Sequence, residues 1–191
     1  MGRSKEFEEN VVLQKAMELF WKQGYEKTSL NDLVEHMGIH RRSLYDTFGD
    51  KHTLFLRVID FYGNLIKTRL TNSVLQAQSE KNAIQCVFDF VISGTGNSCG
   101  CLFVNTATEV APRDEAVKEK TEKAFEQEEE FLRELICKGQ ENGAFSSFYD
   151  AQTLAESLHN TLIGLRVLAR TNVDKDKLHR IAAVSLAMLE K

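Results

Sequence analysis

The sequence predicts an all-α fold of roughly nine helices, because apolar residues recur at helical spacings of three and four along most of its length. Only one proline, Pro112, occurs among 191 residues, and there are only 11 glycines. Prolines and glycines concentrate where strands turn, so their scarcity argues against a β-rich fold. The hydrophobic fraction of 42% is enough to bury a core.

The first three predicted helices form a helix-turn-helix pattern. They cover residues 7–23, 30–37 and 41–48. Gly24 ends the first helix, and Thr28 or Ser29 caps the second, because a hydroxyl accepts hydrogen bonds from the amides of a first turn. Gly38 suits the left-handed backbone of a sharp turn. Two short helices joined by such a turn are typical of a DNA-binding module.

The third helix begins with residues that suit DNA contact. Leu44 and Phe48 are expected to face the core, which leaves the polar side chains outside. Arginine can bond guanine O6 and N7 together, and a tyrosine hydroxyl can bind a phosphate. The predicted DNA-contacting residues are Ser29, His40, Arg41, Arg42, Ser43, Tyr45 and Lys51.

The net charge of the whole chain is less informative than this motif. The formal net charge is −4, which does not suggest nucleic acid, although a small basic patch suffices for DNA contact. Residues 2–5 (Gly-Arg-Ser-Lys) form a short basic arm. This arm is either a disordered terminus or a contact to DNA phosphates or the minor groove.

Residues 7–55 resemble the DNA-binding region of TetR-family transcriptional regulators. The resemblance rests on a run with Gly38, Ile39, Ser43, Leu44, Tyr45, Phe48 and Lys51, and on Phe7, Ala16, Leu19, Phe20, Gly24, Tyr25, Thr28, Leu33, Leu54 and Phe55. It implies a three-helix DNA-binding region, a helical ligand-binding region, a homodimer on a double-stranded DNA operator, and repression relieved by a small-molecule inducer. His40 and Arg42 depart from the residues that many members carry, which affects the expected operator sequence.

The remaining chain is predicted to form the ligand-binding and dimerisation domain. We therefore place a DNA-binding domain at residues 1–50 and a helical domain at 51–191. The predicted helices cover residues 50–70, 82–93, 101–112, 113–139, 150–170 and 175–189. Pro112 is expected at the first position of the helix that follows it, because proline is poorly tolerated inside a helix. The acidic run 126–130 is expected to form a solvated helix face.

Polar groups on the otherwise apolar segment 101–112 suggest a ligand pocket, since such pockets are apolar with a few oriented polar groups. A partly exposed helix face is the alternative. The candidate ligand-binding residues are Tyr62, Phe103, Asn105, Thr106, Glu109 and Phe131.

The last two predicted helices are apolar on more than one face and so need a second partner. A two-fold homodimer would supply it through a four-helix bundle built from 150–170 and 175–189 of each subunit.

The four cysteines are Cys86, Cys99, Cys101 and Cys137, and they are expected to be thiols. Cys99 and Cys101 flank a glycine at a predicted helix start, where a thiolate is favoured. They are either ordinary small residues or a redox or electrophile sensor controlling the same DNA binding.

Several function classes are disfavoured by the sequence. The spacing of Cys99 and Cys101 does not suit zinc, so no metal site is expected. The loop 94–100 misses the dinucleotide-binding glycine pattern, and no nucleophile–base motif is present, so neither a cofactor nor an enzyme is expected. No apolar run could span a bilayer and no signal peptide is visible, which favours a cytoplasmic protein.

Overall fold

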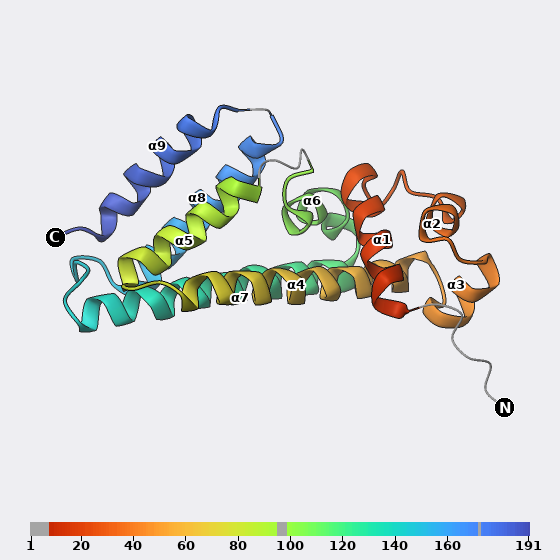
Figure 1. Ribbon diagram of the computed structural model, residues 1–191, viewed down its shortest axis with the longest axis horizontal. Helices are drawn as coiled ribbons and strands as arrows, with labels where there is room; N and C mark the ends of the chain where they lie inside the picture. The colour runs from red at the N-terminus through yellow and green to blue at the C-terminus, as the bar shows by residue number, and fades with distance from the viewer. Residues whose placement is uncertain (1–7, 95–98, 172) are drawn as a thin grey trace. The chain divides into compact units, whose positions relative to one another are not determined.

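A computed structural model describes residues 8–94, 99–171 and 173–191. Within these ranges the chain forms nine α-helices and no strand, which confirms the all-α prediction (Figure 1). The helices are α1 (Glu9–Gln23), α2 (Leu30–Met37), α3 (Arg41–Phe48), α4 (Lys51–Leu75), α5 (Glu80–Ser93), α6 (Leu102–Glu109), α7 (Glu115–Glu141), α8 (Ala151–Ala169) and α9 (Lys175–Leu186).

The chain divides into two compact units. The N-terminal unit consists of Met1–Leu65 and Asn105–Thr121, and the C-terminal unit consists of Ile66–Val104 and Glu122–Lys191. A short segment from the middle of the sequence therefore belongs with the helix-turn-helix. The predicted functional boundary between residues 50 and 51 stays a prediction.

In the N-terminal unit, α1, α2 and α3 share a buried core with the start of α4. Helix α1 packs on α2, and α2 packs on α3. Their inward apolar side chains recur at helical spacing, as the sequence predicts. The buried set is Val12, Leu13, Ala16, Met17, Leu19, Phe20, Leu33, Met37, Leu44, Phe48, Leu54, Phe55, Val58 and Ile59.

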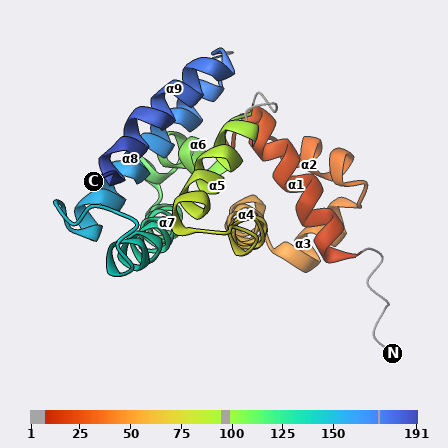
Figure 2. The ribbon, with the colours of Figure 1, turned by 60° about the vertical axis from the view of Figure 1, so that its left-hand side comes forward.

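In the C-terminal unit, α5, α8 and α9 pack on one another, as Figure 2 shows. Phe88 of α5, Ile136 of α7, Leu158 of α8 and Leu178 of α9 are all fully buried in one cluster. Gly139 of α7 is required for close packing, because a Cβ there would lie 2.1 Å from Cδ2 of Phe145. This cluster is the core of the unit.

Three predicted helix boundaries were wrong. Helix α4 continues to Leu75, although the polar segment after residue 70 suggested a frayed end. Helix α6 stops at Glu109, and Pro112 lies in a 3₁₀ turn, η2 (Ala111–Arg113), not at the start of the next helix. The N–H of Val117 donates to the Asp114 carboxylate at 3.0 Å, so an aspartate caps α7 two residues after the proline.

The acidic run on α7 is only partly solvated. Glu126 and Glu130 are exposed, but Glu128 faces inward and pairs with Arg166 of α8. Adjacent residues point in different directions around a helix, so one member of a charged run can be buried.

No helix in the described ranges combines the length and apolarity needed to cross a bilayer.

Candidate nucleic-acid interface

The turn between α2 and α3 is built around Gly38. Its backbone is left-handed, with φ 71° and ψ 35°. The N–H of Gly38 donates to Glu35 O, and the N–H of Ile39 donates to Val34 O. These two bonds satisfy carbonyls at the end of α2 in a Schellman motif, for which glycine is preferred. The sharp turn predicted from the sequence is confirmed.

Ser29, rather than Thr28, caps α2. Its hydroxyl accepts from the N–H of Asp32 at 3.1 Å, and the Asp32 carboxylate accepts from the N–H of Ser29 at 2.8 Å. This reciprocal capping box satisfies two amides at the start of α2. The hydrogen bonds from Ser29 also lower the pKa of Asp32. Thr28 is buried and its hydroxyl donates to Gly24 O at 2.6 Å.

The outer face of α3 carries two arginines and a tyrosine. Leu44 and Phe48 are buried, which leaves the Arg41, Arg42 and Tyr45 side chains exposed. The side chain of Arg42 is 86% exposed, with its Nε 3.6 Å from an Asp46 carboxylate oxygen. At that exposure the ion pair contributes little, so the guanidinium can exchange it for a nucleic-acid acceptor.

Arg41 lies beside Tyr45 on the same face. Its Cζ is 5.9 Å from the Tyr45 ring centroid, and its Nη1 donates a long bond of 3.5 Å to the Asn31 side chain. Asn31 lies on α2 and was not singled out in the sequence, because an exposed asparagine has no distinguishing pattern there. Arg41, Arg42 and Tyr45 together offer two guanidinium groups and one hydroxyl on a single exposed face.

The other predicted DNA-contacting residues flank this face. His40 is exposed at the N-cap position of α3, but its side chain makes no capping hydrogen bond. Ser43 is half-buried. The basic arm of residues 2–5 lies outside the described residues. DNA contact by each of these residues stays a prediction.

Lys51, at the start of α4, is held against an aromatic ring. Its Nζ lies 4.2 Å from the Tyr25 ring centroid, within cation–π range. Burial lowers the pKa of Lys51, while the nearby carboxylates of Glu26 and Glu109 raise it.

The candidate ligand-binding residues divide between the two units. In the N-terminal unit Tyr62 and Thr106 are buried and Asn105 is half-buried. Tyr62 packs edge-on against Trp21, with ring centroids 5.3 Å apart. In the C-terminal unit Phe103 and Phe131 are half-buried. Ligand binding by these residues stays a prediction.

Glu109 has a contact that the sequence did not reveal. Its carboxylate accepts from the backbone N–H groups of Tyr25 and Glu26, more than 80 residues earlier in the chain. Spacing within one helix carries no information about such a distant partner.

The two candidate redox thiols lie on either side of Gly100. Cys99 is half-buried and Cys101 is 8% exposed. Gly100 has φ 72°, and a Cβ there would lie 2.6 Å from Cγ of Arg170. All four cysteines carry thiols, not disulfides. Among the residues that the structure describes, no group of three or more His, Cys, Asp or Glu side chains could hold a metal ion.

Comparison with known proteins agrees with this geometry. Residues 12–58 match the family described as bacterial regulatory proteins, tetR family, and residues 84–184 match the tetracyclin repressor-like, C-terminal domain. The HTH-type transcriptional regulator YezE of Bacillus subtilis (strain 168) is 32% identical over 194 residues, covering 100% of both chains. The HTH-type transcriptional repressor ComR of Escherichia coli (strain K12) is 30% identical over 98% of this chain and 91% of its own.

Solved structures show the same fold. A cysteine mutant of the TetR-family regulator CifR, complexed with 26-bp double-strand operator DNA, has a TM-score of 0.87 and 27% identity. The match covers 98% of this chain and 100% of that one. The family consists of transcriptional regulators, not enzymes. The chain belongs to the TetR family of DNA-binding transcriptional regulators.

Proposed function

We propose that this protein is a dimeric repressor that binds a specific two-fold operator and is released by a small-molecule inducer. The observation that carries the proposal is the exposed group of Arg41, Arg42 and Tyr45 at the start of α3, directly after the Gly38 turn. The N-terminal residues of a second, recognition helix are those that reach base edges in the major groove.

Each exposed side chain has a specific role in this proposal. The guanidinium groups of Arg41 and Arg42 bind guanine O6 and N7, because that edge presents two acceptors in the spacing of the arginine fork. The Tyr45 hydroxyl and the Lys51 ammonium bind phosphates, and Ser29 at the start of α2 contacts the DNA backbone. Base contacts select the sequence, and phosphate contacts fix the register.

Relatives support operator binding and repression. The ComR relative is named a repressor, and the CifR structures contain double-strand operator DNA. Both cover more than nine-tenths of this chain. The same activity in this chain is our inference from that likeness and from the exposed face of α3.

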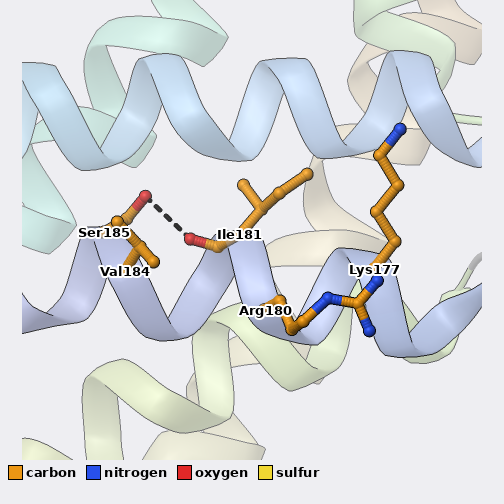
Figure 3. Close-up of a pocket in the computed structure, with 5 residues that line it drawn as sticks. All are labelled: Lys177, Arg180, Ile181, Val184 and Ser185. Atoms are coloured by element: carbon orange, nitrogen blue, oxygen red, sulfur yellow. Dashed lines mark hydrogen bonds between the residues drawn. The ribbon is translucent and has the colours of Figure 1, made fainter.

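The dimer in this proposal forms through α8 and α9. Exposed small or apolar side chains occur on α9 at Ala183 and Val184, and directly after it at Ala187; Val184 is 75% exposed. Figure 3 shows the open groove that Lys177, Arg180, Ile181, Val184 and Ser185 line on this helix. Gly164 of α8 has nothing within 4 Å of the position of an added Cβ, so another helix can approach closely there. Two recognition helices in a dimer would read half-sites about 34–36 Å apart.

The dimer is tested by Val184→Glu, which places a charge on the proposed interface. The matched control is Val11→Glu, because Val11 is another exposed valine, on α1. Light scattering should give a dimer for the wild type and for Val11→Glu, and a monomer for Val184→Glu. If Val184→Glu remains a dimer, as Val11→Glu does, this interface is rejected.

Release by an inducer requires that the inducer bind the DNA-incompetent state more tightly than the DNA-bound state. Phe103 and Phe131 of the C-terminal unit are proposed contacts. The test first requires a compound, found by screening, that releases the protein from DNA. Alanine substitution of Phe103 or Phe131 should then raise the concentration of that compound needed for release. Unchanged concentrations would exclude them as contacts.

DNA binding itself is tested on the duplex upstream of the protein's own coding sequence. Affinity should fall linearly with salt on logarithmic axes, because phosphate contacts release counterions. Arg41→Ala should weaken binding about tenfold or more, and Tyr45→Phe several-fold. Lys138→Ala, at an exposed position of α7 in the C-terminal unit, is the control and should bind like the wild type. Binding that is absent, or insensitive to salt and to both substitutions, would overturn the proposal.

A further inference from the structure

Glu109, the last residue of α6, binds the loop between α1 and α2. Its Oε2 accepts from the N–H of Tyr25 at 3.1 Å, and its Oε1 accepts from the N–H of Glu26 at 3.0 Å. Both amides lie between α1 and α2, beyond the helix end at Gly24. Because charged acceptors strengthen hydrogen bonds, the two bonds hold the backbone of this loop firmly.

The fit of the carboxylate against the loop is close. A Cβ added at Gly24 would lie 2.7 Å from Oε1 and 2.9 Å from Oε2 of Glu109. Gly24 also has φ 86°, which other residues rarely adopt. The absence of a side chain at Gly24 is therefore what lets the carboxylate reach the two amides.

The loop in turn holds a residue proposed to contact DNA. The Tyr25 ring packs on Phe55 with centroids 4.6 Å apart and on Phe20 at 5.9 Å. Its other close neighbour is the Lys51 ammonium, 4.2 Å from the ring centroid. The position of the Tyr25 backbone therefore sets the surface on which Lys51 rests.

The segment that carries Glu109 is tied to α4 at two more points. His52 Nε2 lies 2.7 Å from Asp114 Oδ2, and Lys120 Nζ lies 2.6 Å from Asp60 Oδ1. Burial, and then the charges of the Glu26, Asp114 and Asp50 carboxylates, raise the pKa of Tyr25. The segment Asn105–Thr121 is thus integrated into the unit that contains the helix-turn-helix.

We propose that Glu109 is a positioning residue for DNA binding: through the backbone of Tyr25 it fixes the place from which Lys51 contacts a phosphate. The proposal rests on the proposed DNA-binding function. It also gives Glu109 a role other than the ligand contact expected from the sequence.

Substituting Glu109 removes both a negative charge and a hydrogen-bond acceptor, and these two losses should change DNA affinity in opposite directions. Removing a negative charge from a DNA-binding unit should tighten binding to DNA by simple electrostatics. Removing an acceptor from the loop should loosen Lys51 and weaken binding. Glutamine keeps only one acceptor and turns amide hydrogens toward a backbone N–H, so Glu109→Gln separates the two effects.

The experiment is a double-mutant cycle between Glu109→Gln and Lys51→Ala on the protein's own upstream duplex, measured across salt concentrations. The control is Glu119→Gln, the same change at an exposed position of the same segment. We expect Glu109→Gln to weaken binding about tenfold and to lower the salt slope by about one phosphate contact, as Lys51→Ala does. The double variant should bind no more weakly than Lys51→Ala alone, because coupled residues are not additive. The control should bind as well as the wild type or slightly better.

A role that is only structural would lower the melting temperature but leave the salt slope unchanged. If Glu109→Gln lowers the folded fraction, Glu109→Asp takes its place in the cycle with the same expectation, since it keeps the charge but shortens the reach. The inference is overturned if the Glu109 variants bind as tightly as the wild type, or if their effect adds fully to that of Lys51→Ala. Both of these results leave the salt-dependent DNA binding of the wild type intact. If the wild type itself does not bind the duplex, the proposed function is overturned as well.

Discussion

The guanidinium of Arg166 on α8 holds the carboxylate of Glu128 on α7 through both of its terminal nitrogens. Arg166 Nη1 donates to Glu128 Oε2 at 2.7 Å, and Nη2 donates to Oε1. The imidazole of His159, which is 5% exposed, lies with its Nε2 3.5 Å from the same Oε2. A buried ion pair adds little net stability over an apolar pair, but removing one partner leaves an uncompensated buried charge.

Glu128→Gln should therefore destabilise the protein by about 3 kcal/mol, because it leaves the Arg166 charge buried without its counter-ion. Glu130→Gln is the matched control on the same helix. Glu130→Gln also removes a bidentate partner, that of Arg133, but at an exposed position, so its cost should be far smaller than that of Glu128→Gln. Urea unfolding of both variants measures the difference, and equal costs would contradict this reading of the pair.

The same ion pair should make stability depend on acid pH. Burial raises the pKa of the Glu128 carboxyl, but the combined effects of Arg166 and the neighbouring His159 outweigh burial and lower the pKa to about 2 from 4.5. The unfolded chain thus takes up this proton first as pH falls. The stabilisation is fully present above about pH 4.5 and is lost as pH falls toward 2.

Urea unfolding near pH 5 and pH 3 checks this dependence. The difference between the wild type and Glu128→Gln should shrink by about 2 kcal/mol between these conditions, since one pKa unit is about 1.4 kcal/mol. Other carboxylates titrate equally in both proteins and cancel. A difference that stays constant with pH would mean that Glu128 has an ordinary pKa.

The capping box at Ser29 gives a prediction about both stability and DNA binding. Ser29→Ala should cost about 1 kcal/mol and weaken operator binding, because α2 loses the side chain that orders its first turn. Ser79 caps α5 in the C-terminal unit, where its hydroxyl accepts from the N–H of Asn82 at 3.2 Å. Ser79→Ala should cost a similar amount of stability without changing operator affinity. Thermal unfolding and gel-shift titration of the two variants separate these effects, and equal losses of affinity would argue against a local role for Ser29.

The helix-turn-helix was predictable because its determinants are local. The bounds of α2 and α3 follow from an apolar stripe, a hydroxyl cap and one glycine, all within a few residues of each other. Gly38 illustrates this, since its left-handed backbone is required by hydrogen bonds to residues three and four positions earlier. Such short-range chemistry is visible in a single sequence.

The contacts of Glu109 and Glu128 were not predictable, because their partners lie far away in the chain. The polar pattern around Glu109 suggested a pocket, while its carboxylate binds amides 83 and 84 residues earlier. Glu128 belongs to an acidic run that suggested a solvated face, while its partner Arg166 lies 38 residues later. Helical spacing shows which face of a helix is apolar, but not which charged residue on a neighbouring helix meets it.

The thiol hypothesis predicts that an oxidant releases the protein from DNA through Cys99 and Cys101. Diamide should release the wild type, and the double variant Cys99→Ser, Cys101→Ser should stay bound. Cys137→Ser is the control, because Cys137 is half-buried on α7, away from the turn at Gly100 in sequence. Equal release of the wild type and the double variant would remove the thiols from the account and leave a small-molecule inducer as the signal.

The most direct test of the two-fold DNA-reading proposal is methylation interference on the bound upstream duplex. Dimethyl sulfate blocks guanine N7 in the major groove, the atom that Arg41 and Arg42 are proposed to bind. The account predicts interference at guanines in two half-sites about 34–36 Å apart. It also predicts that Arg41→Ala and Arg42→Ala each lose interference at one guanine of each half-site. Interference at a single half-site, or a pattern that neither variant changes, would contradict it.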